Sequence, residues 1–538
     1  MDIHITRVYI EGFKRFIRFD LELNPTFNVI VGDNETGKTS VLEAIGLVLT
    51  GQYDGHLIQY AIDPYLFNAT CVANYFQKRQ KGEHGDPPRI LIEAHLQSED
   101  NNPALASLKG TNNTRNDDCP GLVLTIEVDS DLVEALKDYA ADESNPTVLP
   151  VEFYRATWRS FADNTVNLRN LPFRAVTIDT SLPRAYRGPN RYVSQRVNDV
   201  LTEQQQRELS IAYKKLRHGF TREPGVTAIN EDLEKRGNPA TTKKLTVQMD
   251  MSSRSSWDSA ITPHLDDLPF DCAGKGEQCR VQMRLAIAGA QKSRVLLIEE
   301  PENHLSHSKL NMFMDDIRKD CADRQVIITT HSAFVLNKLG IDNLRLISHE
   351  GQTAELTRLT PDTKKYFMKL PGYDTLRMIL SKRSILVEGP SDELIVQRAY
   401  KDKHGKLPLE DGVDVIAVGS LAFKRFLEIA VLLRSDVRVV TDNDGDVAGL
   451  QAKYVEYLDG KQPQIKVCYD NDVGCKTLEP QLLKANHRDA LNAIFGKTYK
   501  DDTALLKYMN GNKTDCALRM FETAETWATP GYIANAIE

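Results

Sequence analysis

The segment that most constrains this chain is GDNETGKT, at residues 32–39, which fits the pattern G-x-x-x-x-G-K-[ST]. The apolar run Phe27–Val31 before it predicts a strand, and helical periodicity after it extends to Leu49. A chance glycine loop would lack these flanks. A glycine-rich turn between a strand and a helix points backbone N–H groups at one spot, where phosphate oxygens bind. The pattern therefore predicts a nucleotide site in which Lys38 contacts the terminal phosphates and the Thr39 hydroxyl contacts Mg²⁺.

The composition bounds the class of protein. A length of 538 residues exceeds one ordinary hydrophobic core, so we expect two or three domains. There is no long apolar run and no secretion signal, so we expect a cytoplasmic protein without membrane spans. The eight cysteines form no Cys-x-x-Cys pair, which argues against a zinc site or a disulfide framework. A net charge of −8 neither predicts nor excludes nucleic-acid binding, because a local patch matters more than the sum.

A second strand with an acidic end completes the expected nucleotide site. Four apolar residues, Val295–Ile298, are followed by Glu299 and Glu300. The first carboxylate would hold Mg²⁺ through water, and the second would polarise the attacking water. Alone, this segment would equally fit a buried strand before an exposed acidic turn. Together with the glycine-rich motif, it favours an ATPase.

Two further segments narrow the class of ATPase. Residues 273–291 open with Gly274 and Gly276 and continue with helical periodicity, and a later apolar strand leads into His331. This order resembles the ATPase heads of the ABC, SMC and RecF type, although Ala273 replaces their usual serine. The resemblance implies that the two glycines cap the γ-phosphate of nucleotide held by a partner subunit, and that His331 senses it. The expected nucleotide contacts are Gly32, Asn34, Gly37, Lys38, Thr39, Ser40, Gly274, Gly276, Glu299 and His331.

The chain between residues 51 and 270 carries fewer signals. Residues 89–97 and 121–130 alternate like strands, and the polar segment Asn101–Asp118 is expected to be a surface loop. Residues 184–220 begin with arginines and tyrosines and continue as a long, mostly polar helix. The basic and aromatic side chains would suit phosphate contacts and base stacking, but a solvated arginine face fits equally well. These residues are Arg184, Arg187, Arg191, Arg196, Tyr186 and Tyr192.

The last third of the chain alternates strands and helices, which predicts a small parallel sheet. One strand ends at Glu388, and Asp392 opens the helix that follows. A later strand, Val437–Val440, leads into Asp442 and Asp444. Because ligands bind at the carboxyl ends of parallel strands, we expect Glu388, Asp442 and Asp444 along one edge of the sheet.

Carboxylates gathered at one edge repel one another. Two of them ~4 Å apart repel by about 4 kcal/mol at an effective dielectric of ~20, and a divalent cation removes that cost. Hard oxygen ligands select Mg²⁺ or Mn²⁺. The segment DNDGD at residues 442–446 would also suit a plain acidic turn, but Glu388 on its own strand favours a metal site. A glutamate at one strand end with Asp-x-Asp at another resembles the Toprim fold of topoisomerases, primases and OLD-family nucleases.

An ABC-type head followed by a C-terminal Toprim domain resembles the OLD (overcoming lysogenisation defect) ATP-dependent endonucleases, including Gabija-like and retron-associated members that act in anti-phage defence. The expected fold class is therefore α/β: a P-loop ATPase head with an inserted helical dimerisation region, followed by a Toprim α/β domain. The expected bounds are 1–180 and 266–360 for the two parts of the head, 181–265 for the insertion, 361–383 for a linker with a helix, and 384–538 for the Toprim domain.

The resemblance also implies a reaction, two-metal hydrolysis of DNA. It implies that Glu479 completes a second metal position and that Lys513 stabilises charge on the phosphate in the transition state. The expected catalytic residues are Glu388, Asp442, Asp444, Lys513 and Glu300. The expected metal ligands are Glu388, Asp392, Asp442, Asp444, Glu479, Thr39 and Glu299. The expected cofactors are ATP with one ion and two Mg²⁺ or Mn²⁺ ions in the Toprim site. The expected partners are double-stranded DNA, further copies in a dimer or tetramer, and a helicase or a reverse transcriptase with its nucleic acid.

Two other functions remain open from the sequence. A repair clamp of RecF type would bind DNA by ATP-driven dimerisation without cutting it, and would have no use for the carboxylates after residue 384. A topoisomerase or primase would use the Toprim fold. Against these, Tyr469 is a candidate nucleophile only by its position, and the scattered cysteines offer no zinc module for a template.

Overall fold

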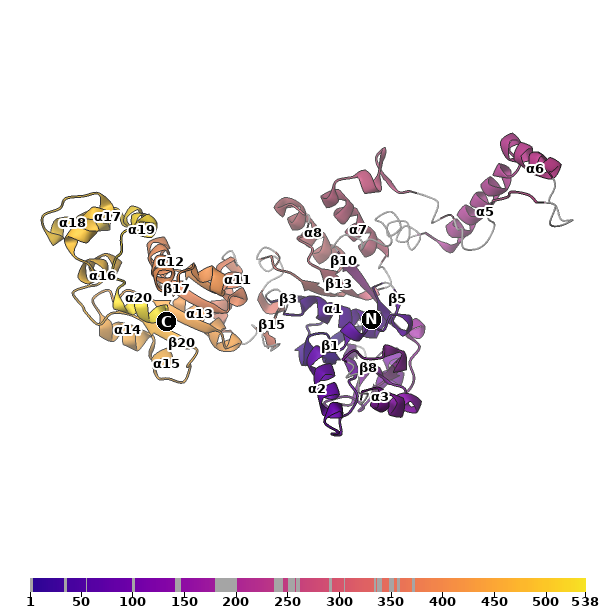
Figure 1. Ribbon diagram of the computed structural model, residues 1–538, viewed down its shortest axis with the longest axis horizontal. Coiled ribbons are helices and arrows are strands. Elements are labelled where there is room, and N and C mark those ends of the chain that lie inside the picture. The colour runs from indigo at the N-terminus through magenta and orange to yellow at the C-terminus, as the bar shows by residue number, and fades with distance from the viewer. Residues whose placement is uncertain are drawn as a thin grey trace. The chain divides into compact units, whose positions relative to one another are not determined.

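The computed structural model describes most of the chain, which divides into two compact units (Figure 1). One unit comprises Met1–Ile17, Glu22–Phe27 and Val41–Thr330, and the other comprises Arg18–Leu21, Asn28–Ser40 and His331–Glu538. Residues that are not described are 1–2, 33–35, 55, 99–101, 141–146, 180–200, 237–244, 250–256, 258–261, 290–292, 304, 333–334, 336–340, 348–352, 356–358 and 370–372. No helix within the described ranges is long and apolar enough to cross a membrane.

An antiparallel sheet forms early in the chain, with its strands in the order β2-β1-β6-β8-β7 and β9 paired to β8. The bounds are β1 Ile3–Phe13, β2 Phe16–Glu22, β6 Ile90–Ser98, β7 Lys109–Gly110, β8 Cys119–Val128 and β9 Tyr154–Ser160. In the sequence, helix α2 (Ala69–Gln80) precedes β6, and helix α3 (Val133–Ala140) lies between β8 and β9. The strands predicted at residues 89–97 and 121–130 are confirmed. The predicted loop Asn101–Asp118 is only partly a loop, because a 3₁₀ helix at Pro103–Leu108 buries two leucines.

A second sheet carries the glycine-rich motif, with its strands in the order β10-β13-β14-β3-β15-β16. The bounds are β3 Phe27–Val31, β10 Arg174–Asp179, β13 Ser293–Glu299, β14 Gln325–Thr329, β15 Leu344–Ile347 and β16 Thr353–Glu355. Three helices belong to these strands in sequence: α1 (Lys38–Thr50) after β3, α7 (Lys275–Gly289) before β13, and α8 (His307–Asp320) between β13 and β14. The predicted order of strand, glycine-rich turn and helix is confirmed. The apolar runs are buried, as strands covered on both faces require.

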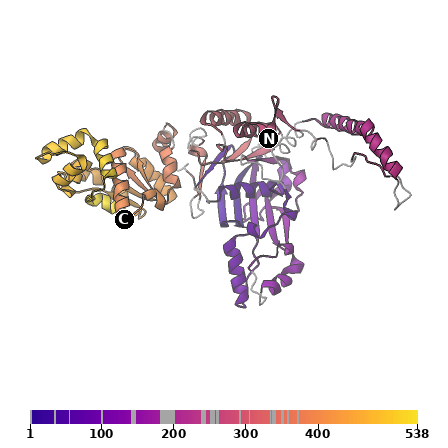
Figure 2. The ribbon, with the colours of Figure 1, turned by 45° about the horizontal axis from the view of Figure 1, so that its top comes forward.

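The middle of the chain contains two helices, α5 (Glu203–Phe220) and α6 (Pro224–Arg236), drawn in magenta in Figure 2. A capping box starts α5: the Thr202 hydroxyl accepts from the Gln205 N–H at 3.3 Å, and the Gln205 side chain accepts from the Thr202 N–H at 2.9 Å. The long helix predicted here is confirmed. The basic and aromatic residues predicted to contact nucleic acid lie outside the described residues, and they are Arg184, Arg187, Arg191, Arg196, Tyr186 and Tyr192.

The C-terminal third forms a four-stranded parallel sheet in the order β18-β17-β19-β20. The bounds are β17 Arg383–Val387, β18 Val413–Ala417, β19 Asp436–Val440 and β20 Ile465–Cys468. Helix α12 (Pro390–His404) connects β17 to β18, and α13 (Phe423–Leu433) connects β18 to β19. The predicted parallel sheet is confirmed. The predicted linker with one helix instead holds two helices, α10 (Pro361–Lys369) and α11 (Tyr373–Leu380).

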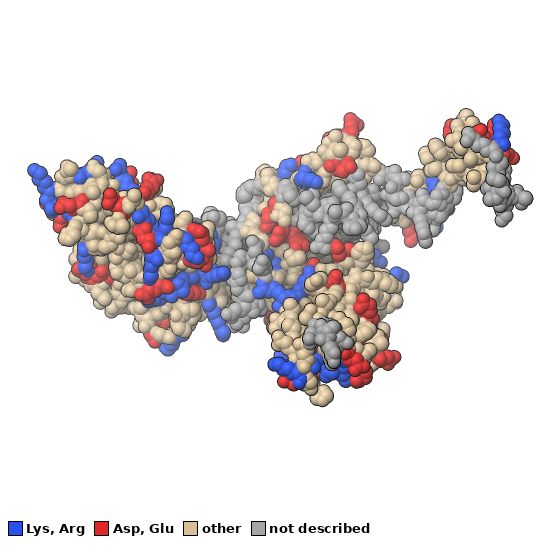
Figure 3. Space-filling model, viewed as in Figure 1, with Lys and Arg blue, Asp and Glu red and all other residues tan. Residues whose placement is uncertain are grey.

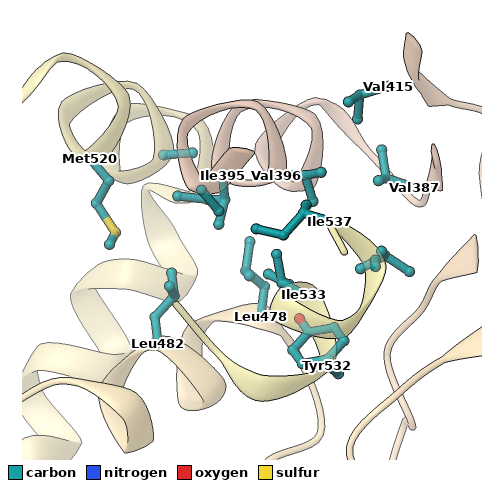
Figure 4. Close-up of a cluster of buried hydrophobic side chains, with 14 of the residues drawn as sticks. Val387, Ile395, Val396, Val415, Leu478, Leu482, Met520, Tyr532, Ile533 and Ile537 are labelled. Atoms are coloured by element: carbon teal, nitrogen blue, oxygen red, sulfur yellow. The ribbon is translucent and has the colours of Figure 1, made fainter. Parts of the chain in front are cut away.

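Further helices complete this domain around one apolar core (Figure 4). They are α14 Val447–Lys453, α15 Val455–Leu458, α16 Leu478–Ala485, α17 Arg488–Phe495, α18 Asp502–Gly511, α19 Lys513–Glu522 and α20 Gly531–Ala536. The core joins side chains of β17, β18 and β19 to those of α12, α16 and α20. Helix α13 packs against β19 and β20 and adds no residue to this cluster, which fits a helix on the opposite face of the sheet.

Candidate active site

Glu388 and Asp442 meet at the carboxyl edge of the C-terminal sheet. Strands β17 and β19 are parallel neighbours with Leu386 opposite Val439, so the residues that follow both strands emerge together. The Thr441 hydroxyl donates to Glu388 Oε1 at 2.7 Å, and the Asp442 N–H donates to the same oxygen at 3.1 Å. The predicted convergence of these two acidic strand ends is confirmed.

Asp392 lies at the same edge, in the first turn of α12. Its carboxylate accepts a hydrogen bond from the Gly389 N–H at 3.1 Å, which caps the start of the helix. Burial raises the pKa of Asp392 to about 6, with the Glu388 charge as the next cause, while the bond from Gly389 opposes the shift. The predicted position of Asp392 at the start of the next helix is confirmed.

The turn after β19 is held by the side chain of Asn443, which lies between Asp442 and Asp444 in the sequence. The Asn443 side-chain amide donates to the carbonyls of Asp470 and Asp472 at 2.8 and 2.9 Å. The Asn443 Oδ1 accepts from the Gly445 N–H at 2.8 Å. Asp444 has a positive φ of 49°, which lets the turn fold back tightly. Asn443 thus fixes the direction in which this acidic turn leaves the strand.

Glu479 and Lys513 form an ion pair, and the metal and catalytic roles that the resemblance implies for them stay predictions. Glu479 lies in the first turn of α16, well beyond β20, and only 3 % of its surface is exposed. The Thr477 hydroxyl donates to Glu479 Oε2 at 2.9 Å, and Lys513 Nζ lies 3.2 Å from Oε1. The Lys513 side chain is half exposed, so one face of its ammonium group remains open to solvent.

The five acidic residues act on one another electrostatically. Burial and, after it, the charges of Asp392, Glu388, Glu479 and Asp444, in that order of effect, together raise the pKa of Asp442 to about 8. Burial thus disfavours the charged form, and four neighbouring anions add to that penalty. A cation placed among these carboxylates would reverse both effects.

The donor set fits hard divalent ions, because every candidate ligand is a carboxylate oxygen. Its present arrangement is open: within the described residues, no three His, Cys, Asp or Glu side chains converge closely enough to hold an ion. Binding of a metal would therefore require side-chain rotation at this edge.

The glycine-rich turn of the head holds its lysine internally. Lys38, 5 % exposed, donates from Nζ to the Gly32 carbonyl at 3.0 Å. Gly37 has a φ of 97°, a backbone conformation that glycine adopts readily and other residues rarely adopt. Thr39 and Ser40 lie in the first turn of α1, where phosphate binding is expected, and Asn34 lies outside the described residues.

The other predicted nucleotide contacts each lie at the end of an element. Glu299 is the last residue of β13, and Glu300 follows with a positive φ of 40° while its N–H donates to the Thr329 carbonyl at 2.9 Å. His331 follows β14 by one residue, and Gly274 immediately precedes α7. Gly276 lies in the first turn of α7. The helix start predicted for this segment is confirmed, and the roles of these residues stay predictions.

Comparison with known families assigns the domains. The model described as "Overcoming lysogenization defect protein-like, TOPRIM domain" matches residues 379–444, which hold Glu388, Asp392, Asp442 and Asp444. An AAA domain model matches residues 7–120, and another, described as "AAA domain, putative AbiEii toxin, Type IV TA system", matches residues 159–337. The chain carries AAA-type ATPase domains and an OLD-like TOPRIM domain. Glu479 and Lys513 lie beyond the matched part of the TOPRIM domain.

Relatives show the same two resemblances over shorter stretches. An OLD nuclease of Thermus scotoductus is 26 % identical over 215 residues, which is 37 % of this chain and 40 % of that protein. The DNA replication and repair protein RecF of Actinobacillus pleuropneumoniae is 37 % identical over 70 residues, or 12 % of this chain and 19 % of RecF. The chain thus spans less than half of these relatives.

Solved structures with a similar fold include an SMC head domain from Thermotoga maritima and the recombination mediator RecF. The SMC head is 13 % identical with a TM-score of 0.29, covering 64 % of this chain and 94 % of that one. The RecF structure is 12 % identical with a TM-score of 0.34, covering 66 % and 99 %.

The TOPRIM domain holds site residues that motif reasoning missed. Thr441 and Asn443 are buried polar residues that orient the acidic strand ends, and their position beside the aspartates could have signalled this. Tyr532, which lies in the same buried cluster as Val440 and Leu478, is 88 residues beyond Asp444. Its surroundings, PGYIANA, look like ordinary helix core, so no sequence signal marks it.

Proposed function

We propose that this protein is a metal-dependent endonuclease that cleaves double-stranded DNA and is controlled by ATP binding to its head. The observation that carries the proposal is the meeting of two acidic strand ends, where the Thr441 hydroxyl and the Asp442 N–H donate to Glu388 Oε1 at 2.7 and 3.1 Å, with Asp392 and Glu479 acting on the Asp442 carboxylate. Burying several anions together is costly unless a cation joins them. A structural turn would have no need for that arrangement.

The residues of the site divide the work. Glu388, Asp392, Asp442, Asp444 and Glu479 would hold two Mg²⁺ or Mn²⁺ ions, which supply an activated water and steady the leaving oxygen when bound. Thr441 and Asn443 keep the ligands oriented through their hydrogen bonds. Lys513 would turn its open face to the phosphate and stabilise the charge that develops on it.

The head would bind ATP and a third divalent ion. Lys38 would exchange its bond to the Gly32 carbonyl for the terminal phosphates, and Thr39 and Glu299 would hold the ion. Glu300 would polarise the attacking water. Gly274 and Gly276 would cap nucleotide held by a second copy, so ATP would join two heads.

The partners follow from the same account. Helix α5 exposes Leu209, Leu216 and Phe220 on one side, with side-chain spacing of seven and four residues, which suits contact with a second copy in a dimer or tetramer. On the face drawn in Figure 3, Lys and Arg are interspersed with Asp and Glu over the C-terminal region. DNA contacts there would be local, and would centre on residues such as Lys513.

A role in anti-phage defence in the cytoplasm, with a helicase or a reverse transcriptase and its nucleic acid as partner, is supported by the resemblance to OLD proteins. It is tested by plating phage on cells that carry the gene with its neighbours. Wild type should lower plating efficiency, and Asp442→Ala should restore it. Equal plating on both would remove this role while leaving the nuclease proposal intact.

The nuclease is tested with supercoiled plasmid. Purified full-length protein is incubated in Mg²⁺ or Mn²⁺, with and without ATP, beside Asp442→Ala and Lys38→Ala. The proposal expects nicking or linearisation that Asp442→Ala loses while its ATP binding is kept. Comparing cleavage with and without ATP, and by Lys38→Ala, then shows whether nucleotide activates or inhibits the nuclease.

A second candidate function is a RecF-like clamp that binds DNA without cutting it, which the 37 % identity to RecF over 70 residues favours. The clamp expects DNA binding that depends on Lys38 and ATP, with intact plasmid in every metal. DNA binding that survives Lys38→Ala, together with strand breaks, would exclude it.

A further inference from the structure

Tyr532 is held in a fixed place beside the TOPRIM site by the last helix of the chain. Helix α20 packs against β19, β20 and α12, the elements that carry or precede the acidic residues. His404 Nε2 lies 2.9 Å from the Ile537 carbonyl, and Lys466 Nζ donates to the Asn535 carbonyl at 3.2 Å. In Figure 4 the Tyr532 ring lies next to Leu478, the residue before Glu479. The ring therefore has little freedom to move.

The hydroxyl of Tyr532 is buried without a partner. The residue is 4 % exposed, and no described residue lies within hydrogen-bonding distance of its oxygen. A buried hydroxyl without a partner destabilises a fold, and phenylalanine would fill the same apolar space without that penalty. The hydroxyl is therefore expected to find an acceptor in another state of the site.

The buried cluster around Tyr532 indicates where that acceptor lies, because it contains Val387, Val440 and Leu478, the residues that lead into Glu388, Thr441–Asp442 and Glu479. Burial raises the pKa of the Tyr532 hydroxyl well above its ordinary value, and the negative charge of Asp442 is the next cause. Asp392, Glu388 and Glu479 act in the same direction. The hydroxyl thus keeps its proton and can act as a donor.

Asp442 is the matching acceptor. Glu388, Asp392 and Glu479 each accept at least one hydrogen bond, from Thr441, Gly389 and Thr477 among others. No described residue donates to the carboxylate of Asp442, whose hydrogen bonds are made by its backbone N–H to Glu388 and its backbone carbonyl from Thr441. An unpaired donor and an unpaired acceptor thus belong to the same site.

We infer that Tyr532 is a positioning residue whose hydroxyl donates a hydrogen bond to the Asp442 carboxylate when the TOPRIM site binds a divalent ion. The inference rests on the proposed function. Binding requires Asp442 to be ionised and turned toward the other ligands, and a donor behind a metal ligand fixes that orientation.

The test compares two matched removals of a buried hydroxyl in the full-length protein. Tyr532→Phe removes it at the TOPRIM site. Tyr154→Phe removes another buried hydroxyl without a partner, in the antiparallel sheet of the head. Thermal unfolding is followed while MnCl₂ is titrated, and the Mn²⁺ concentration that gives half of the stabilisation is recorded. This midpoint is a readout of metal binding that needs no DNA.

The inference expects the midpoint to rise roughly tenfold in Tyr532→Phe, as for other residues that orient a metal ligand, and to stay at the wild-type value in Tyr154→Phe. Both variants should keep the metal-free melting temperature or raise it. A wild-type midpoint in Tyr532→Phe would overturn the inference. Failure of Mn²⁺ to stabilise even wild type would instead overturn the metal centre of the proposed function, and the inference with it.

Discussion

The ATPase head and the TOPRIM domain bury charges of opposite sign, and the two buried charges differ in their hydrogen-bond partners. In the head, Lys38 donates to the Gly32 carbonyl within its own turn. In the TOPRIM domain, Asp442 lies among other carboxylates, and burial raises its pKa to about 8. The buried cation has an acceptor nearby in the sequence, whereas the carboxylate of the buried anion has no donor among the described residues.

This difference teaches which site depends on its ligand. A backbone carbonyl can satisfy a lysine, so the buried Lys38 does not require nucleotide as its partner. Carboxylates cannot satisfy one another, so the TOPRIM edge must either bind protons or bind cations. We therefore expect substitutions in the head to change control, and substitutions in the TOPRIM domain to change chemistry and metal-linked stability.

The strongest way to break this comparison is Asp442→Asn. Cleavage should fall by about three orders of magnitude or more, because a central metal ligand loses its charge. ATP binding, measured with a fluorescent nucleotide, should match wild type. Glu522→Gln, a change at the exposed C-terminal end of α19, serves as a control that also removes one carboxylate. Loss of ATP binding in Asp442→Asn would show that the two sites are not separable.

Lys38→Ala makes the converse change. Nucleotide affinity should drop by about a hundredfold, since the main cationic contact to the phosphates is lost. Stabilisation by Mn²⁺ in the absence of nucleotide should stay as in wild type, because the TOPRIM ligands are untouched. Mn²⁺ stabilisation that vanishes in this variant would place the stabilising ion in the head instead.

Alanine substitutions at two glycines of the head should have different effects. A Cβ at Gly32 would lie 2.5 Å from Thr36 Oγ1 and 2.7 Å from the Ile347 carbonyl oxygen, whereas a Cβ at Gly274 meets nothing within 4 Å. Gly32→Ala should therefore destabilise the protein by about 2 kcal/mol in denaturant unfolding and abolish nucleotide binding. Gly274→Ala should leave the stability as it is and weaken only ATP-driven dimerisation, measured by light scattering. Equal effects of the two changes would contradict the assigned roles.

A smaller effect is expected from pH, which should change the stability of the TOPRIM site. Asp442 and Asp392 have folded-state pKa values of about 8 and about 6, above the ordinary 3.8. Between pH 4 and 8 the folded protein thus holds more protons than the unfolded chain, so this site lowers stability as pH rises. Mn²⁺ replaces those protons, so its stabilising effect should be larger at pH 8 than at pH 5.5, by about 3 °C.

Asp442→Asn is the control for the pH effect. It removes the buried carboxylate, so the metal-free variant should melt above wild type, by more at pH 8 than at pH 5.5. Stabilisation by Mn²⁺ that is independent of pH would contradict the raised pKa of Asp442.

Leu216→Asp on α5 should have the smallest effect on the nucleotide site of the head and on the TOPRIM site. Leu216 is 68 % exposed, so the monomer should keep its stability within about 0.5 kcal/mol. If α5 contacts a second copy, a buried charge there should shift the protein toward monomer in sedimentation. Gln204→Asp, near the start of the same helix, is the control.

The sequence predicted most of what depends on local pattern. The strand, turn and helix around Lys38 follow from one motif and its flanks. The meeting of Glu388 and Asp442 could be predicted because parallel strands end at a common edge, although these residues are 54 positions apart. Asp392 followed from its spacing to Glu388 and the start of a helix.

What the sequence did not predict depends on contacts across the fold. Tyr532 approaches the acidic site only because α20 returns to β19, and no motif encodes that return. The loop expected at Asn101–Asp118 is partly a buried 3₁₀ helix, because Leu105 and Leu108 find apolar partners that polar neighbours concealed. Glu479 was expected only from the resemblance, and its burial in the first turn of α16 follows from the packing of its neighbours Leu478 and Leu482 in the core.

The most direct test is to locate Mn²⁺ by anomalous scattering in crystals of the full-length protein. The account predicts a peak at the carboxyl edge of β17 and β19, in contact with Glu388 and Asp442, and its loss in crystals of Asp442→Asn. A wild-type map with no peak at this edge, while Mn²⁺ stabilises the protein in solution, would contradict the account.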